Sequence, residues 1–314
     1  MSIALVVLMY ATWSSVFSIG KIALQYSSPL FLTGFRMALA GLLILGYLLL
    51  AKRDVLKIPK KFFLSLFLLA FFSIYLTNIL EFWSLQYLTA AKTCFIYSLS
   101  PFFAAFFSYL HFNEKMNRSK WIGLSIGLAG MIPVLLTQTG PEKLLSAFSV
   151  FSWPSLAMIG AALCSVYGWI LLRLIVKDHA ISPLTANSMS MLLGGMFALV
   201  HSFFSEKWQP FPIEQGHEGS FIQIALLMVL VFNIICYNLY GVMLKRYTAT
   251  FLSFMGLLSP IFATLNGWLF LGESPSWVIL LSTAIVSIGL WIVYRAELKQ
   301  GYIVVTKKEQ LIQD

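Results

Sequence analysis

The chain has 314 residues, of which 59% are hydrophobic and only 11% are charged. Its mean hydropathy is +0.85, whereas roughly a quarter of the residues of a soluble domain are charged. A water-soluble globule of this size could not cover its surface with so few charges. The composition therefore predicts an all-α polytopic membrane protein, and it argues against nucleic-acid binding despite a formal net charge of +9.

Ten apolar segments are each long enough to cross a membrane as a helix, which takes about 20 residues. Helices are required because the hydrocarbon core offers no water to satisfy backbone groups. In chain order, the predicted spans cover residues 3–22, 30–50, 62–85, 89–111, 120–137, 155–176, 184–204, 221–243, 247–271 and 277–294.

Charge sets the expected orientation of these spans. Sixteen of the eighteen lysines and arginines in the loops and the tail fall on one side of a ten-span arrangement, and only Lys143 and Lys207 fall on the other. Cytoplasmic loops carry an excess of basic residues. We therefore expect both termini in the cytoplasm of a bacterial cell, with the protein in its inner membrane.

The two halves of the chain share a pattern at an offset of 159 residues. Under this shift, Pro101 falls on Pro260 within a common Leu-Ser-Pro sequence, and Glu114 falls on Glu273. Because each half contains five spans, the second half enters the membrane from the opposite side. Such an inverted repeat is typical of alternating-access transporters.

The chain resembles the EamA type of the drug/metabolite transporter superfamily. The resemblance rests on Trp13, Phe17, Lys21, Pro29 and Arg36 in the first half, and on a proline, a glutamate and a glycine-bearing fifth helix in each half. It covers residues 3–295 and implies ten helices around a central cavity, but it fixes neither substrate nor direction. The second half departs from the pattern, with Ser190 where the first half has Arg36.

The resulting domain prediction has four parts. Residues 1–137 form a first EamA-like repeat and residues 138–154 an external linker. Residues 155–295 form a second EamA-like repeat, and residues 296–314 a cytoplasmic tail.

Ionisable residues inside the spans are the first candidates for a solute site, because charge at membrane depth is costly and usually functional. Glu81 and Lys92 flank the predicted turn between spans 3 and 4, so an antiparallel hairpin could bring them together. They would form either a structural ion pair or a site for the ammonium and carboxylate of a zwitterion. Arg36 and Lys21 are expected to have structural roles at helix carbonyls or at the membrane surface.

Buried amides and aromatic rings give further candidates. Amides in membrane helices often only join helices, but the spans contain five asparagines, more than helix packing alone requires. Aromatic rings could form the walls of a cavity. The candidate solute contacts of these types are Asn78, Asn238, Asn266, Trp13, Tyr97, Tyr167 and Trp169.

Pro101 and Pro260 lie near the middles of spans 4 and 9. A proline in a helix interior removes a backbone hydrogen bond and kinks the helix. These two are therefore predicted hinges, with static packing kinks as the alternative.

The sequence contains no HExxH, CxxC, GxSxG or P-loop motif, which predicts no catalytic residues, metal or cofactor. We expect a secondary transporter, an exchanger or ion-coupled, for an amino acid or a derivative such as S-adenosylmethionine. A membrane-embedded enzyme and a non-transporting scaffold subunit are the alternatives. Expected partners are the solute, the bilayer and a coupling proton or counter-solute, with the protein a monomer or weak homodimer.

Overall fold

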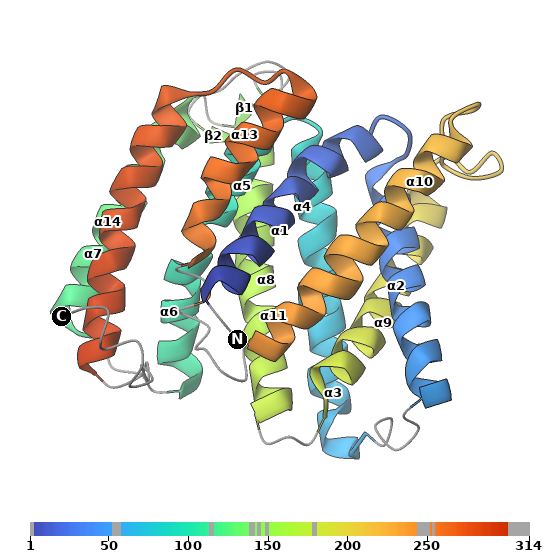
Figure 1. The fold of residues 1–314 in the computed structure, drawn as a ribbon, viewed down its shortest axis with the longest axis horizontal. Coiled ribbons are helices and arrows are strands. Elements are labelled where there is room, and N and C mark those ends of the chain that lie inside the picture. The colour runs from blue at the N-terminus through green and yellow to red at the C-terminus, as the bar shows by residue number, and fades with distance from the viewer. Residues whose placement is uncertain are drawn as a thin grey trace.

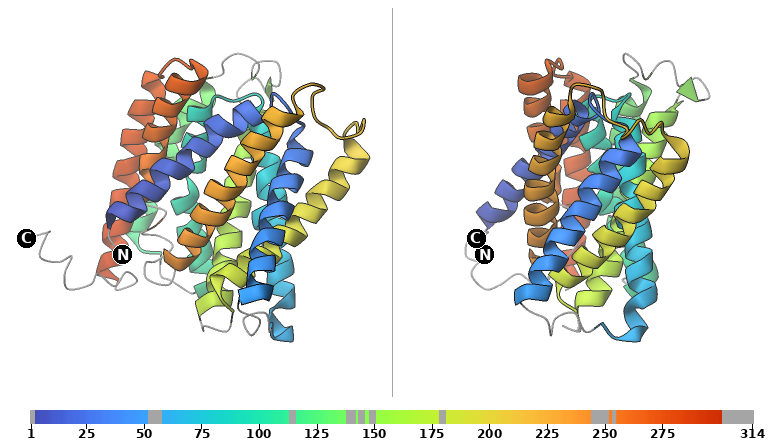
Figure 2. Two further views of the ribbon diagram at one scale, coloured as in Figure 1. Left: turned by 45° about the vertical axis from the view of Figure 1, so that its right-hand side comes forward. Right: turned by 90° about the vertical axis from the view of Figure 1, so that its right-hand side faces the viewer.

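The computed structural model describes residues 3–51, 58–112, 116–137, 142, 146–147, 151–177, 181–243, 252 and 255–300. Within these ranges the chain is a bundle of long helices, several of them tilted against one another (Figure 1). The first helix starts, and the last helix ends, on the same side of the bundle (Figure 2). An even number of membrane crossings requires this placement.

The first half contains five predicted spans, two of them built from more than one helical segment. The elements are α1 (Ile3–Ala23), α2 (Pro29–Ala51), the 3-10 turn η2 (Lys60–Phe62), α3 (Phe63–Leu69), the π-helix η3 (Ala70–Leu76), α4 (Thr77–Leu85), α5 (Ala90–Tyr97), α6 (Ser100–Phe112) and α7 (Arg118–Leu136).

The second half repeats this order after a short antiparallel strand pair in the predicted linker. Its elements are β1 (Ser146–Ala147), β2 (Phe151–Ser152), α8 (Trp153–Lys177), α9 (Pro183–Ser205), α10 (Glu218–Met228), the π-helix η5 (Val229–Cys236), α11 (Tyr237–Met243), the 3-10 turn η6 (Gly256–Leu258), α13 (Ser259–Leu271) and α14 (Trp277–Lys299).

Nine helical stretches among the described residues are long and apolar enough to cross a membrane. They match nine of the ten predicted spans. The remaining one, 247–271, is described at residue 252 and from residue 255 on, as η6 and α13. The prediction of a polytopic helical membrane protein is confirmed.

The offset of 159 residues seen in the sequence also relates features of the backbone. The π-helix η3 begins at Ala70 and η5 begins at Val229. Helix α6 begins at Ser100 after a break in span 4, and α13 begins at Ser259 after η6. Both irregularities therefore recur at the same depth of equivalent helices, which supports two structurally similar units. Glu114, the sequence partner of Glu273, lies outside the described residues.

Equivalent helices of the two halves pack against each other. The most extensive helix contacts are α2 with α9 and α7 with α14, which are spans 2 and 7 and spans 5 and 10. Gly41 approaches Leu192, and Gly34 approaches Leu199, so α2 and α9 run antiparallel. Small residues allow this close approach, as is usual for helices packed within membranes.

The outer surface of the bundle is apolar. Large hydrophobic side chains such as Leu50, Phe204 and Trp277 are each more than three-quarters exposed. Soluble monomers rarely expose large contiguous apolar patches. This surface fits contact with lipid chains rather than water.

Candidate functional site

A cavity lies in the middle of the bundle, between the two halves. It encloses about 1010 Å³ that no atom occupies, including its opening to solvent. Its wall is drawn from α1, α2, α4, α5, α6 and α8, and from η5, α11, η6 and the start of α13. Five predicted solute contacts (Trp13, Asn78, Glu81, Tyr97 and Trp169) line it, as does the predicted hinge Pro101.

Arg36 is the cationic group of the cavity wall, and only 2% of its surface is exposed. One terminal nitrogen, Nη1, donates to Asn233 Oδ1 at 3.3 Å, and Nη2 donates to Asn78 Oδ1. The guanidinium also lies 4.6 Å from the centre of the Phe82 ring, a favourable cation–π contact. Its Nε–H has no hydrogen-bond partner in the described part of the chain.

The two π-helical segments explain how both asparagines reach Arg36. Asn78 is the second residue after η3, and its Nδ2 donates to the carbonyl of Ile74 at 2.7 Å, while its Oδ1 accepts from Arg36. Asn233 lies within η5 and donates to the sulfur of Met37 at 2.9 Å. π-Bulges occur frequently at functional sites, and here both serve the same side chain.

Glu81 is the anionic group of the same wall. The residue is 8% exposed, and its carboxylate interacts electrostatically with Arg36 and with the Tyr97 and Tyr237 hydroxyls. Neither a hydrogen bond nor an ion pair holds it among the residues that the structure describes. Buried charges are almost always paired or hydrogen-bonded. The Glu81 carboxylate is therefore free to accept hydrogen bonds from a ligand.

Four aromatic rings from three helices form a second part of the wall, which we call the aromatic cluster: Trp13, Trp169, Tyr237 and Tyr240. The closest pair is Trp169 and Tyr240, with ring centres 4.4 Å apart. The Trp13 ring lies 5.3 Å from that of Tyr237. Such separations are typical of favourable aromatic pairs.

Both predicted hinge prolines lie in the first turn of a helix rather than within one. Pro101 follows the break between α5 and α6, and Pro260 lies in the first turn of α13. A proline fits the first turn because the amide it lacks would have no partner there. The spans are thus interrupted where a kink was expected, and the hinge role itself stays a prediction.

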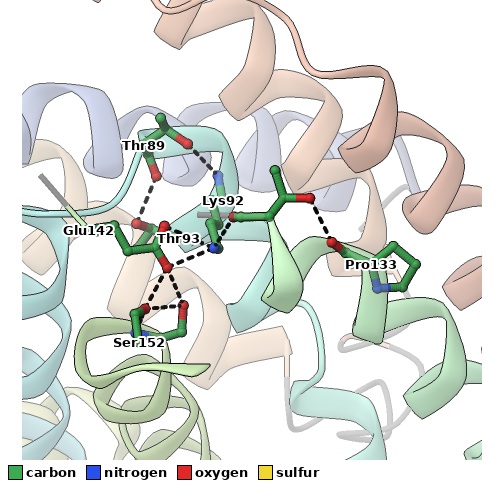
Figure 3. Close-up of polar contacts among 8 residues, drawn as sticks. Thr89, Lys92, Thr93, Pro133, Glu142 and Ser152 are labelled. Atoms are coloured by element: carbon green, nitrogen blue, oxygen red, sulfur yellow. Dashed lines mark hydrogen bonds and ion pairs between the residues drawn. The ribbon is translucent and has the colours of Figure 1, made fainter. Parts of the chain in front are cut away.

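Glu81 and Lys92 do not form the ion pair that the sequence offered as one interpretation, because Lys92 pairs with another carboxylate. The Lys92 ammonium bonds the carboxylate of Glu142 at 2.8 Å, and their side chains are only 5% and 1% exposed. Ser152 and Ser155 donate to the same carboxylate, and the Thr137 carbonyl accepts from Lys92 (Figure 3). The linker therefore supplies the partner of Lys92, and Lys92 does not line the central cavity.

Three other predicted contacts lie elsewhere in the described structure. Tyr167 packs edge-on against the ring of Phe72 and at a tilt against that of Phe107. Asn238 accepts a hydrogen bond from Asn187 on α9. These residues and Asn266, which is half-buried in α13, do not line the central cavity. Asn238 therefore joins α11 to α9.

A second polar cluster joins helices at the end of the bundle nearest Glu81, and we call it the latch: Lys21, Glu273 and the start of α5. Lys21 Nζ donates to Glu273 Oε1 at 2.9 Å and to the Leu88 carbonyl at 2.7 Å. The Glu273 carboxylate also accepts from the Ala90 amide at 3.0 Å, at the first residue of α5. The latch thus joins spans 1, 4 and 9.

This is the architecture of a membrane transporter, with a polar and aromatic cavity enclosed by two similar helical units. The EamA-like transporter family matches residues 1–136 and 152–295, and the chain belongs to this family. Its membership confirms the resemblance seen in the sequence and favours transport over the enzyme alternative.

Among known proteins, the chain is 40% identical to the S-adenosylmethionine/S-adenosylhomocysteine transporter of Chlamydia muridarum, over 96% of this chain and 94% of the relative. It is 25% identical to a WAT1-related chloroplastic protein of Arabidopsis thaliana, over 90% of this chain and 66% of the relative. A solved crystal structure at 15% identity has a TM-score of 0.67 and covers 94% of this chain, which shows the fold.

Sequence reasoning missed Arg36 and Tyr240 as parts of the cavity wall. The sequence predicts a structural role for Arg36 at helix carbonyls or headgroups, because its depth in span 2 fits either. The signal that could have corrected this was the pair of asparagines at similar depth, Asn78 and Asn233, which offer amide oxygens to a buried guanidinium.

Proposed function

We propose that this protein is a secondary transporter for S-adenosylmethionine and S-adenosylhomocysteine, moving them by alternating access and exchanging one for the other. The observation that carries the proposal is the central cavity, whose wall combines a buried base, a buried acid and an aromatic cluster. A solute that joins a nucleoside to an amino acid can use the acid and the base for its amino-acid end and the aromatic rings for its nucleobase. The 40% identity to the Chlamydia muridarum transporter along nearly the whole chain supports the same substrates.

Uptake into liposomes tests this proposal. Purified protein in liposomes loaded with unlabelled S-adenosylhomocysteine should accumulate labelled S-adenosylmethionine, because efflux of one drives entry of the other. Empty liposomes should take up much less. Free amino acids or nucleosides that compete as well as S-adenosylhomocysteine would contradict the substrate assignment, and conversion of the solute would favour an enzyme.

We further propose that both termini lie in the cytoplasm of a bacterial cell, so that α1 begins on the cytoplasmic side. The distribution of loop cations supports this orientation. The latch and the Lys92–Glu142 pair then lie on the external side. In this orientation the described conformation has polar contacts between helices on the external side. Transport requires that these contacts break in the alternative state.

Glu273→Gln is expected to open the external side more often, because a neutral amide weakens both the contact with Lys21 and the cap on α5. Cys94 lines the cavity near this end and serves as a native probe once Cys164 and Cys236 are replaced by serine. A membrane-impermeant thiol reagent added outside should label Cys94 several-fold faster in the variant.

The matched control is Glu214→Gln, which removes an exposed carboxylate from the loop before α10 on the same side. Its labelling rate should equal that of the parent. Equal rates in Glu273→Gln and Glu214→Gln would show that the latch does not hold the external side closed.

A further inference from the structure

Two ionic side chains of the central cavity have bonding capacity that the protein leaves unused. Arg36 commits Nη1 and Nη2 to asparagines, whereas its buried Nε–H lacks a partner among the described residues. Glu81 is buried on the same wall without a hydrogen bond or ion pair in that part of the chain. Unsatisfied buried polar groups are rare and call for an explanation.

Two other carboxylates of the described structure each accept from a lysine and from further donors. Glu142 receives Lys92 and two serine hydroxyls, and Glu273 receives Lys21 and a backbone amide. Arg36 and Glu81, which have capacity left, both line the central cavity. A ligand that carries both charges would satisfy both at once.

Resting on the function proposed above, we propose that Arg36 and Glu81 hold the amino-acid end of the solute. The Arg36 Nε–H donates to the carboxylate of the solute, and the Glu81 carboxylate accepts from its ammonium. The opposite charges of the two side chains, within electrostatic range of each other, match the zwitterion of an α-amino acid.

The two named substrates of the relative strengthen this assignment. S-adenosylmethionine and S-adenosylhomocysteine differ only in one methyl group on sulfur, and therefore in the charge of the sulfur. A single site that accepts both must recognise the parts that they share, the amino-acid end and the adenosine. Arg36 and Glu81 recognise the first of these parts.

The aromatic cluster takes the second shared part. Its rings come from α1, α8 and α11, whereas Arg36 and Glu81 come from α2 and α4, so the two subsites lie on different helices around one cavity. Base–aromatic stacking contributes about 1–3 kcal/mol per base in proteins that bind nucleic acids. Tyr237 lies within electrostatic range of Arg36 and Glu81, which joins the two subsites.

The test compares ligands with and without the amino-acid end. Arg36→Lys keeps the charge that holds Asn78 and Asn233 but lacks the Nε–H, and Glu81→Gln keeps the shape of the side chain without its charge. The dissociation constants of S-adenosylhomocysteine, S-adenosylmethionine and 5′-methylthioadenosine are measured on purified protein. The last of these retains the adenosine and the thioether but has no amino acid.

In each variant, the dissociation constants of the two amino-acid-bearing ligands should rise about tenfold or more, because a charged hydrogen bond is lost. The dissociation constant of 5′-methylthioadenosine should change less than about twofold. Retained binding of this ligand also shows that the variant is folded. Trp169→Leu, the matched control in the aromatic cluster, should weaken all three ligands.

Two results would overturn the assignment: unchanged affinities in both variants, or an equal loss for all three ligands. Failure of the proposed function gives a different result. In that case the parent protein itself binds neither S-adenosylmethionine nor S-adenosylhomocysteine.

Discussion

Replacing Gly41 by valine is expected to prevent stable assembly of the two halves. A Cβ at this position would lie 2.5 Å from the backbone nitrogen of Leu192, and Gly195 makes the reciprocal approach to the backbone of Ala38 at 2.4 Å. Backbone atoms cannot move aside unless α2 and α9 separate, and these helices form the largest contact between the halves. We expect a loss of about 3 kcal/mol or more in the free energy of unfolding.

The matched control is Gly46→Val in the same helix, where an added Cβ meets no atom within 4 Å. Its effect should stay within about 0.5 kcal/mol. The yield of monodisperse protein and the midpoint of thermal unfolding in detergent measure both variants. If the two variants behaved alike, the close approach of α2 and α9 would not be what holds the halves together.

The single change Lys92→Met is expected to destabilise the protein by about 3 to 5 kcal/mol, because it leaves the Glu142 charge buried without a cation beside it. Glu142→Gln should have an effect of similar size by leaving the Lys92 ammonium uncompensated. The double variant should recover much of the loss, since no unpaired charge then remains. Thermal unfolding of the four proteins gives the coupling between the two residues.

Lys21→Met provides the comparison, because the Lys21 and Glu273 side chains are 28% and 15% exposed and water can replace part of the lost contact. Its cost should be about 1 kcal/mol or less. The pairing of Lys92 with Glu142 predicts no rescue of Lys92→Met by Glu81→Gln. Rescue by that change would restore the pairing first expected from the sequence.

Because Lys92 pairs with Glu142, Glu81 and Lys92 have separate roles. The hairpin between spans 3 and 4 does place Glu81 and Lys92 near the same end of the bundle, as the sequence predicts. However, Glu81 lies on the face of α4 that lines the cavity, whereas Lys92 points to the linker. One acid and one base do share the cavity, but the base is Arg36.

The sequence by itself determined the membrane class, nine of the described spans and the repeat offset of 159 residues, which the structure extends to the π-helices and the broken spans. Hydrophobic length and local motifs decide these features, and both can be read along the chain. The sequence also identified Trp13, Asn78, Glu81, Tyr97 and Trp169, because polar and aromatic residues at membrane depth are informative without a partner being known.

Only the tertiary structure decided which of these residues meet. Arg36 bonds residues 42 and 197 positions away, and Lys92 bonds one 50 positions away across the linker. Helical periodicity gives each side chain a face and a depth, but several partners on other helices share that depth. The packing of α2 against α9, made close by Gly41 and Gly195, fixes which face of each helix turns inward. That choice places Arg36 in the cavity, whereas the fold of the linker places Glu142 beside Lys92, outside the cavity.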